Sequence, residues 1–114
     1  MKKLKIYIAG AYSSDTEEGK LQNTLKAVDA GIKVFKMGHY PYIPHLTHWV
    51  DQRSIEINNL LTYEDYMEWD DVFLQCCDAF LYLSKSKGAD VELSRAKKMG
   101  KIIFYSLKEI LEII

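Results

Sequence analysis

Four stretches of the chain have the pattern of β-strands. Largely apolar runs at residues 4–9, 78–83 and 101–105 are typical of buried strands in a sheet. The segment 39–44 is extended, and its two prolines place it at a sheet margin or at the exit into a loop. The pattern therefore predicts a small sheet with one marginal strand.

Helical spacing dominates the segments between these strands. Apolar residues recur every three or four positions in the first segment, which predicts a long helix from the polar residues 13–18 to about Lys36 (Leu21, Leu25, Val28, Ile32 and Phe35). Further helices are expected at 62–76, 88–99 and 107–114. Gly38 and Gly100 are predicted helix stops, and Thr62 with Asp65 is a predicted helix cap. The pattern over 45–59 is weak and predicts a loop with one short helix.

The order of these elements favours one architecture. Strands separated by helices imply a parallel sheet with right-handed crossovers. We expect residues 1–114 to form a single α/β domain, a small three-layer sandwich around a parallel sheet of four to five strands, of flavodoxin-like or Rossmann-like kind. Its ligand crevice is expected beyond the carboxyl ends of the strands, where segments 10–14, 44–48 and 84–92 meet.

Composition narrows the function classes. The 114 residues are 48% hydrophobic and 27% charged, as in an ordinary globular domain, and the net charge of -1 gives no general attraction to a nucleic acid polymer or an anionic membrane. No apolar run approaches membrane-spanning length. Cys76 and Cys77 are adjacent, so a disulfide between them would be strained, and we expect a reducing, cytoplasmic setting.

Two acids occupy unusual positions. The helical neighbours of Asp70 are apolar or aromatic (Tyr66, Met67, Phe73 and Leu74), so burial is expected to raise its pKa and favour the protonated acid. Glu92 is expected in the first turn of a helix among small residues, where the helix dipole favours the ionised form. Each acid alone has a structural explanation: Asp70 could pair with Arg95, and Glu92 could simply complement the dipole.

Together the two acids indicate a particular chemistry more specifically than either acid does alone. One neutral and one charged carboxyl group are the minimum equipment for breaking a glycosidic bond. Ser86 and Gly88 open the helix that carries Glu92, where free backbone N–H groups could hold a hydroxyl or a phosphate. For Ser86, a plain helix cap is the structural alternative.

These residues match a family pattern. The chain resembles the nucleoside 2-deoxyribosyltransferase-like superfamily, which includes the deoxynucleoside monophosphate N-glycosidases, over roughly residues 6–105. The resemblance rests on Ile6-Tyr7-Ile-Ala-Gly10, on Asp70-x-x-x-Leu74-x-x-Cys77-Asp78, and on Ser86-x-Gly88-x-x-x-Glu92-Leu93-x-Arg95-Ala96 with a closing Gly100. It implies cleavage or transfer at the N-glycosidic bond of a nucleoside or nucleoside 5′-monophosphate, without a cofactor or a metal.

The resemblance also implies residue roles. Glu92 would attack the sugar and form a covalent glycosyl intermediate, and Asp70 would act as general acid or base. Tyr7 would orient Glu92, and Ser86 would contact the 5′ end of the substrate. Relatives complete their pockets across a subunit boundary, so the resemblance implies a homodimer or a larger assembly.

Other residues near the expected crevice remain candidates. Gly10 and Tyr12 follow the first strand, and Tyr12 is the tyrosine best placed for a ligand contact. His45, His48 and Asp51 could be read as a zinc site, but we favour His45 or Trp49 as a wall of the base side of the pocket. The alternative function is a non-catalytic nucleotide-binding or sensing module on the same fold, in which the acids only bind hydroxyls.

Overall fold

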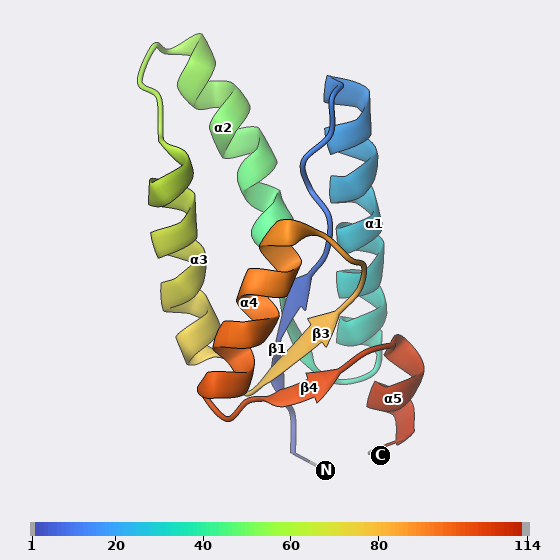
Figure 1. The fold of residues 1–114 in the computed structure, drawn as a ribbon. Coiled ribbons are helices and arrows are strands. Elements are labelled where there is room, and N and C mark those ends of the chain that lie inside the picture. The colour runs from blue at the N-terminus through green and yellow to red at the C-terminus, as the bar shows by residue number, and fades with distance from the viewer. Residues whose placement is uncertain (1, 113–114) are drawn as a thin grey trace.

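The computed structural model describes residues 2–112, which form a three-layer α/β sandwich (Figure 1). The four strands are β1 (Lys5–Ala9), β2 (Tyr40–Tyr42), β3 (Ala79–Tyr82) and β4 (Ile102–Phe104). They pair in parallel in the order β2-β1-β3-β4. The helices are α1 (Glu17–Lys36), α2 (Thr47–Glu56), α3 (Tyr63–Cys76), α4 (Lys87–Lys98) and α5 (Leu107–Glu112), with a 3₁₀ turn at Pro44–Leu46. The predicted fold class is confirmed.

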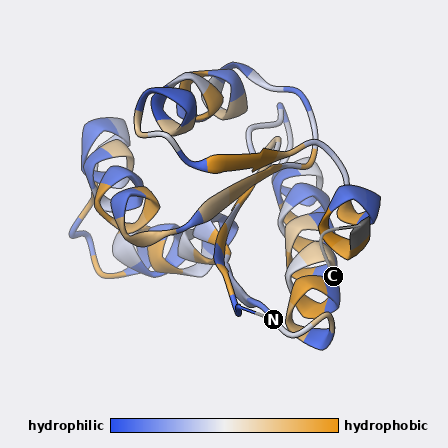
Figure 2. Cartoon of the chain, turned by 90° about the horizontal axis from the view of Figure 1, so that it is seen from below, coloured by the Kyte–Doolittle hydropathy of each residue, from blue (hydrophilic) through white to orange (hydrophobic). Residues whose placement is uncertain are grey.

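Alternation along β1 separates two cores. Ile6 and Ile8 point to one face of the sheet, where α1 and α5 pack, and Tyr7 and Ala9 point to the other, where α3 and α4 pack. Seen from below, the hydrophobic strands lie between helices on both sides (Figure 2). From β1 the chain adds β2 on one side of the sheet, and then β3 and β4 on the other side. The carboxyl ends of β1 and β3 therefore form the topological switch point, where α/β proteins bind ligands.

Local signals set most helix ends. Gly38 and Gly100 follow α1 and α4 with φ angles of 95° and 74°, a conformation that glycine adopts without strain. Thr62 and Asp65 form a reciprocal capping box at the start of α3. The predicted stops and the predicted cap are therefore confirmed.

The long helix predicted to end at about Lys36 and the short helix predicted within 45–59 are confirmed as α1 and α2. The segment 45–59 contains the three-turn helix α2, whose buried residues, His48 and Ser54, are polar and so leave no apolar pattern. In α1 the apolar stripe faces outward, and Phe35 is 59% exposed. The small residues Ala27, Ala30 and Gly31 face the sheet instead, because they allow α1 to approach it closely.

The described helices include none with the length and hydrophobicity of a transmembrane segment. The final predicted helix is confirmed as far as Glu112, and its last two residues lie outside the described part of the chain.

Candidate functional site

A cavity of about 670 Å³ lies at the carboxyl edge of the sheet. Its walls come from the loop after β1, the 3₁₀ turn with α2, the inner side of α3 and the first turns of α4. All of the sequence-predicted site residues except Tyr7 line it: Gly10, Tyr12, His45, Asp70, Ser86, Gly88 and Glu92. The structure thus brings together segments that are up to 82 positions apart, from Gly10 to Glu92.

Tyr7 does not line the cavity, but it forms a hydrogen bond to Glu92, which does. The Tyr7 side chain is fully buried in β1, stacked on Phe80 at a ring distance of 5.7 Å and next to Tyr42 at 5.5 Å. Its hydroxyl donates a hydrogen bond to Oε2 of Glu92. Burial, and then the charge of Glu92, raises the pKa of Tyr7 far above its usual value, so the hydroxyl stays protonated and remains a donor.

Glu92 is less acidic than the sequence suggested. Burial raises its pKa from 4.5 to about 7, while the Tyr7 hydrogen bond and the charge of Arg95 act in the opposite direction. We expected the helix dipole to favour the ionised form. Glu92 is the sixth residue of α4 and lies in the second turn, past the first turn in which the dipole acts strongly, so burial dominates.

Asp70 has the environment expected of a protonated acid. Burial, and then the charge of Glu92, raises its pKa from 3.8 to about 7, against an opposing effect of Tyr42. Its Oδ1 is buried and has no hydrogen-bond partner among residues 2–112. The alternative pairing with Arg95 is wrong, because Nη1 of Arg95 lies 3.7 Å from Oδ1 of Asp71 instead.

The two carboxyl groups therefore titrate as a pair. Glu92 has a donor, Tyr7, and a nearby cation, Arg95, that stabilise its carboxylate, whereas Asp70 has a buried oxygen without a partner. Near neutral pH this asymmetry places the negative charge on Glu92 and the proton on Asp70. The pair then consists of a nucleophilic carboxylate and an acid in one cavity.

The start of α4 forms an electropositive wall of the cavity. Ser86 caps the helix by accepting a hydrogen bond of 3.0 Å from the backbone N–H of Ala89, and its own hydroxyl proton remains available to a ligand. A Cβ atom at Gly88 would meet nothing within 4 Å, so the cavity reaches the backbone there. Lys87 adds a positive charge to this wall.

Asp90 does not oppose that charge inside the cavity. Its carboxylate accepts hydrogen bonds from the Tyr82 hydroxyl at 2.6 Å and from Nζ of Lys85 at 2.9 Å, and it is not among the lining residues. The side chains that face a ligand at the start of α4 are therefore Ser86 and Lys87, which are neutral and cationic. This wall suits a hydroxyl or a phosphate.

The end of β1 is joined to the neighbouring elements by polar contacts. Nε2 of His45 lies 3.1 Å from the carbonyl oxygen of Gly10, and burial lowers the pKa of His45, so we take the imidazole as neutral with its proton on Nε2. The Tyr12 hydroxyl lies 2.8 Å from Nδ1 of His48. Both histidines thus have hydrogen-bond partners in the protein. Within residues 2–112, no group of three or more His, Cys, Asp or Glu side chains has an arrangement that could hold a metal ion.

Sequence reasoning missed the wall formed by α2 and the first half of α3. The Tyr66 hydroxyl donates a hydrogen bond of 2.9 Å to Oδ1 of Asp51, and both residues line the cavity. Burial, and then Asp51, raises the pKa of Tyr66 to about 12. Trp49, considered as a pocket wall, is 45% exposed and is not among the lining residues. Recognition of α2 would have placed His48 and Asp51, three residues apart, on one helix face.

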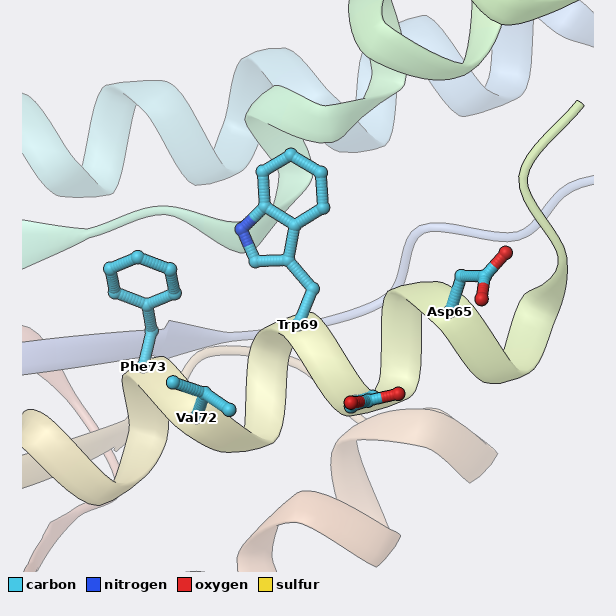
Figure 3. A pocket seen from close by; sticks show the side chains of 5 residues that line it. Asp65, Trp69, Val72 and Phe73 are labelled. Carbon is cyan, nitrogen blue, oxygen red and sulfur yellow. The ribbon is translucent and has the colours of Figure 1, made fainter. Parts of the chain in front are cut away.

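A second, shallower hollow of about 330 Å³ lies on the outer side of α3. Figure 3 shows Trp69 and Phe73 projecting from the same side of the helix, with Val72 beside them. Phe73 also stacks on Tyr42 at a ring distance of 4.8 Å. The hollow contains no predicted catalytic residue, and its exposed apolar side chains are typical of a contact surface rather than a reaction site.

Comparison with known proteins identifies the family. No curated protein matches the chain. The family described as Domain of unknown function (DUF4406) matches residues 4–105, which include every strand and every residue of the cavity. The chain therefore belongs to the DUF4406 family.

Proposed function

We propose that the protein cleaves, or transfers a group at, the N-glycosidic bond of a nucleoside or nucleoside 5′-monophosphate. The observation that carries this proposal is the pair of half-buried carboxyl groups, Glu92 and Asp70, in one cavity, with Glu92 oriented by Tyr7. The resemblance of the sequence to the nucleoside 2-deoxyribosyltransferase-like superfamily supports the same reaction.

The first step would be displacement at the sugar. The Glu92 carboxylate attacks the anomeric carbon while the bond from that carbon to the base nitrogen breaks, and the electron pair of that bond goes to the base. Asp70 gives its proton to the base, which leaves neutral. The product is a glycosyl ester of Glu92.

The second step would release the sugar. The Asp70 carboxylate accepts a proton from water or from a second base, which then attacks the anomeric carbon and displaces Glu92 as a free carboxylate. Water as acceptor gives hydrolysis, and a second base gives transfer. Both carboxyl groups return to their starting protonation states.

The walls of the cavity suggest how the substrate would lie. Ser86, Lys87 and Gly88 offer a hydroxyl, a cation and an open backbone at the start of α4, which suits the 5′ end of the substrate. The base would lie on the side of Asp70, because that residue must reach the leaving nitrogen.

The decisive experiment follows base release. The purified protein is incubated with deoxynucleosides, ribonucleosides and their 5′-monophosphates, and free base is measured by chromatography. We expect wild type to release base and Glu92→Gln to be inactive, with a sugar adduct on wild-type protein in rapidly quenched samples analysed by mass spectrometry. Asp90→Asn is the matched control, because it removes a carboxylate of α4 outside the cavity, and it should retain activity.

The alternative functions give different results. Saturable binding of a nucleotide without release of base would support the sensing module and contradict the catalytic proposal. Base release that survives in Glu92→Gln would exclude Glu92 as the nucleophile.

We also propose that the working form is a homodimer in the cytoplasm. Among the residues of α3, Leu74 alone is buried, while Trp69 is 38%, Val72 51% and Phe73 44% exposed. A second copy that covers this face would bury the apolar side chains beside the hollow of Figure 3. The free cysteines, Cys76 exposed and Cys77 buried, suit a reducing compartment.

A further inference from the structure

Asp51 is a carboxylate in the cavity that the two-step reaction does not use. Its Oδ1 accepts a hydrogen bond from Tyr66, which fixes the orientation of the group. Oδ2 has no hydrogen bond to the protein, and none of the ion pairs formed within residues 2–112 includes Asp51. A half-buried carboxylate with one fixed and one free oxygen is suited to bind a hydrogen-bond donor of a ligand.

The position of this group relates it to the base rather than to the sugar. Tyr66 precedes Asp70 by four residues on α3, so the two side chains share one face of the helix. Asp70 must lie next to the leaving base, and Ser86 and Gly88, at the start of α4, are assigned to the 5′ end of the substrate. The base therefore extends from Asp70 along α3 toward Tyr66 and Asp51.

Apolar side chains complete this end of the cavity. Met67, Leu61 and Tyr63 line it together with the Tyr66–Asp51 pair. A planar ring can pack against such side chains, while its polar edge meets the carboxylate. The end is thus built for a flat group that carries hydrogen-bond donors at its rim.

The polar groups of this pair present acceptors. Oδ2 of Asp51 can only accept, and the proton of the Tyr66 hydroxyl is engaged in the hydrogen bond to Asp51, so the Tyr66 oxygen can also only accept from a ligand. An exocyclic amino group would donate to them, whereas a carbonyl oxygen in the same place would face two acceptors and be repelled. The geometry therefore favours amino-substituted bases.

We infer that Asp51, oriented by Tyr66, selects nucleobases with an exocyclic amino group over their oxo counterparts. The inference rests on the proposed function, because the base side of the cavity is defined by the role of Asp70. Deoxycytidine with deoxyuridine, and deoxyadenosine with deoxyinosine, are matched pairs that differ in this group and in the hydrogen on the adjacent ring nitrogen.

The test compares these four nucleosides in wild type and in Asp51→Asn. A hydrogen bond to a charged group corresponds to a preference of about 10- to 100-fold in kcat/KM for the amino member of each pair. In Asp51→Asn the amide oxygen can still accept from Tyr66, and the NH₂ group replaces the free acceptor with a donor. We expect the preference to disappear or to reverse toward deoxyuridine and deoxyinosine, mainly through KM.

A second variant checks the role of Tyr66. Tyr66→Phe keeps the carboxylate but removes the bond that orients it, so the preference should decrease without reversing. An Asp51→Asn protein that lowers activity equally on both members of each pair would overturn the inference. So would a wild type without preference.

Measurements of nucleoside binding test this inference independently of the proposed reaction. The same nucleosides are titrated by calorimetry into Glu92→Gln and into Glu92→Gln with Asp51→Asn. Preferential binding of the amino members that is lost with Asp51→Asn, without base release by wild type, supports the role of Asp51 and contradicts the reaction. Base release without an amino preference supports the reaction and contradicts the role of Asp51.

Discussion

The Tyr7 hydroxyl, on the central strand β1, donates a hydrogen bond to the Glu92 carboxylate on α4. The Tyr7 ring is fully buried between Tyr42 and Phe80, so the donor is fixed by the core of the sheet and not by a surface loop. A side chain in the core of the sheet therefore orients the proposed nucleophile, which is the arrangement that catalysis by preorganised groups requires.

Tyr7→Phe should lower kcat/KM by about 10- to 100-fold, because a hydrogen bond to a charged group is lost. In wild type the reaction needs ionised Glu92 and protonated Asp70, so we expect a bell-shaped pH profile centred near pH 7. The Tyr7 bond lowers the pKa of Glu92, so its removal should shift the acidic limb to higher pH. The measurement is kcat/KM for base release from pH 5 to 9.

Tyr82→Phe is the matched control for that measurement. Tyr82 loses a hydroxyl that bonds Asp90 outside the cavity, and both the rate and the pH profile should remain those of wild type. An unchanged acidic limb in Tyr7→Phe would show that Tyr7 does not act on Glu92.

The carboxyl pair should make the protein less stable as the pH rises. The pKa values of Asp70 and Glu92 are about 7 in the folded protein and 3.8 and 4.5 as ordinary values. Between pH 4 and 7 the folded state thus binds more protons than the unfolded state, and the free energy of unfolding falls as pH increases. Above this window the loss is complete and constant.

Asp70→Asn combined with Glu92→Gln should remove that dependence. The double variant should be more stable than wild type at pH 8 and closer to it at pH 5, measured by urea unfolding at both values. Asp71→Asn removes a neighbouring carboxylate that is paired with Arg95, and it should keep the wild-type slope. Parallel curves for wild type and the double variant would contradict the raised pKa values.

The strands, the ends of most helices and the grouping of the cavity residues were predictable from sequence. Gly38, Gly100 and the Thr62–Asp65 box act through local geometry, which a single sequence contains. The carboxyl ends of parallel strands must share one edge of the sheet, so the proximity of Gly10 and Glu92 could be predicted from the sequence alone.

The rest depends on how elements pack. The side of α1 that faces the sheet is set by how closely the helix can approach the strands. The small side chains of Ala27 and Ala30, and Gly31, allow a close approach that the large Phe35 side chain would prevent. Asp51 reaches the cavity only because α2 folds back toward α3, and no local pattern encodes that contact. The pKa of Glu92 follows from its burial, which its position in the helix alone does not reveal.

Asp70→Asn should lower the rate of base release by about 10²- to 10⁴-fold, the usual contribution of a general acid. The loss should be much smaller for 7-methyldeoxyguanosine, because its cationic base leaves without needing a proton. The comparison is kcat for deoxyguanosine and its 7-methyl derivative in wild type and variant. Equal losses on both substrates would mean that Asp70 acts in binding or orientation rather than as the acid.

Val72→Glu should dissociate the proposed dimer. Val72 is 51% exposed on the outer side of α3, and a buried charge without a partner opposes association. Sedimentation equilibrium should give about twice the chain mass of 13.2 kDa for wild type and the chain mass for the variant. Ile32→Glu, on the opposite face of the sheet in α1, is the control and should remain dimeric. A monomeric wild type at micromolar concentration would contradict the proposal.

Thr62→Ala should loosen α3 and, with it, the position of Asp70. The Thr62 hydroxyl accepts from the backbone N–H of Asp65 at 3.1 Å, and the Asp65 carboxylate accepts from the backbone N–H of Thr62 at 2.8 Å. Loss of such a cap costs about 1 kcal/mol, and α3 has little buried surface to offset it, since Leu74 alone of its residues is buried. We expect faster hydrogen exchange in residues 63–70 with unchanged protection in β1, together with a lower kcat. Uniformly faster exchange across the sheet would show that α3 does not open separately from the core.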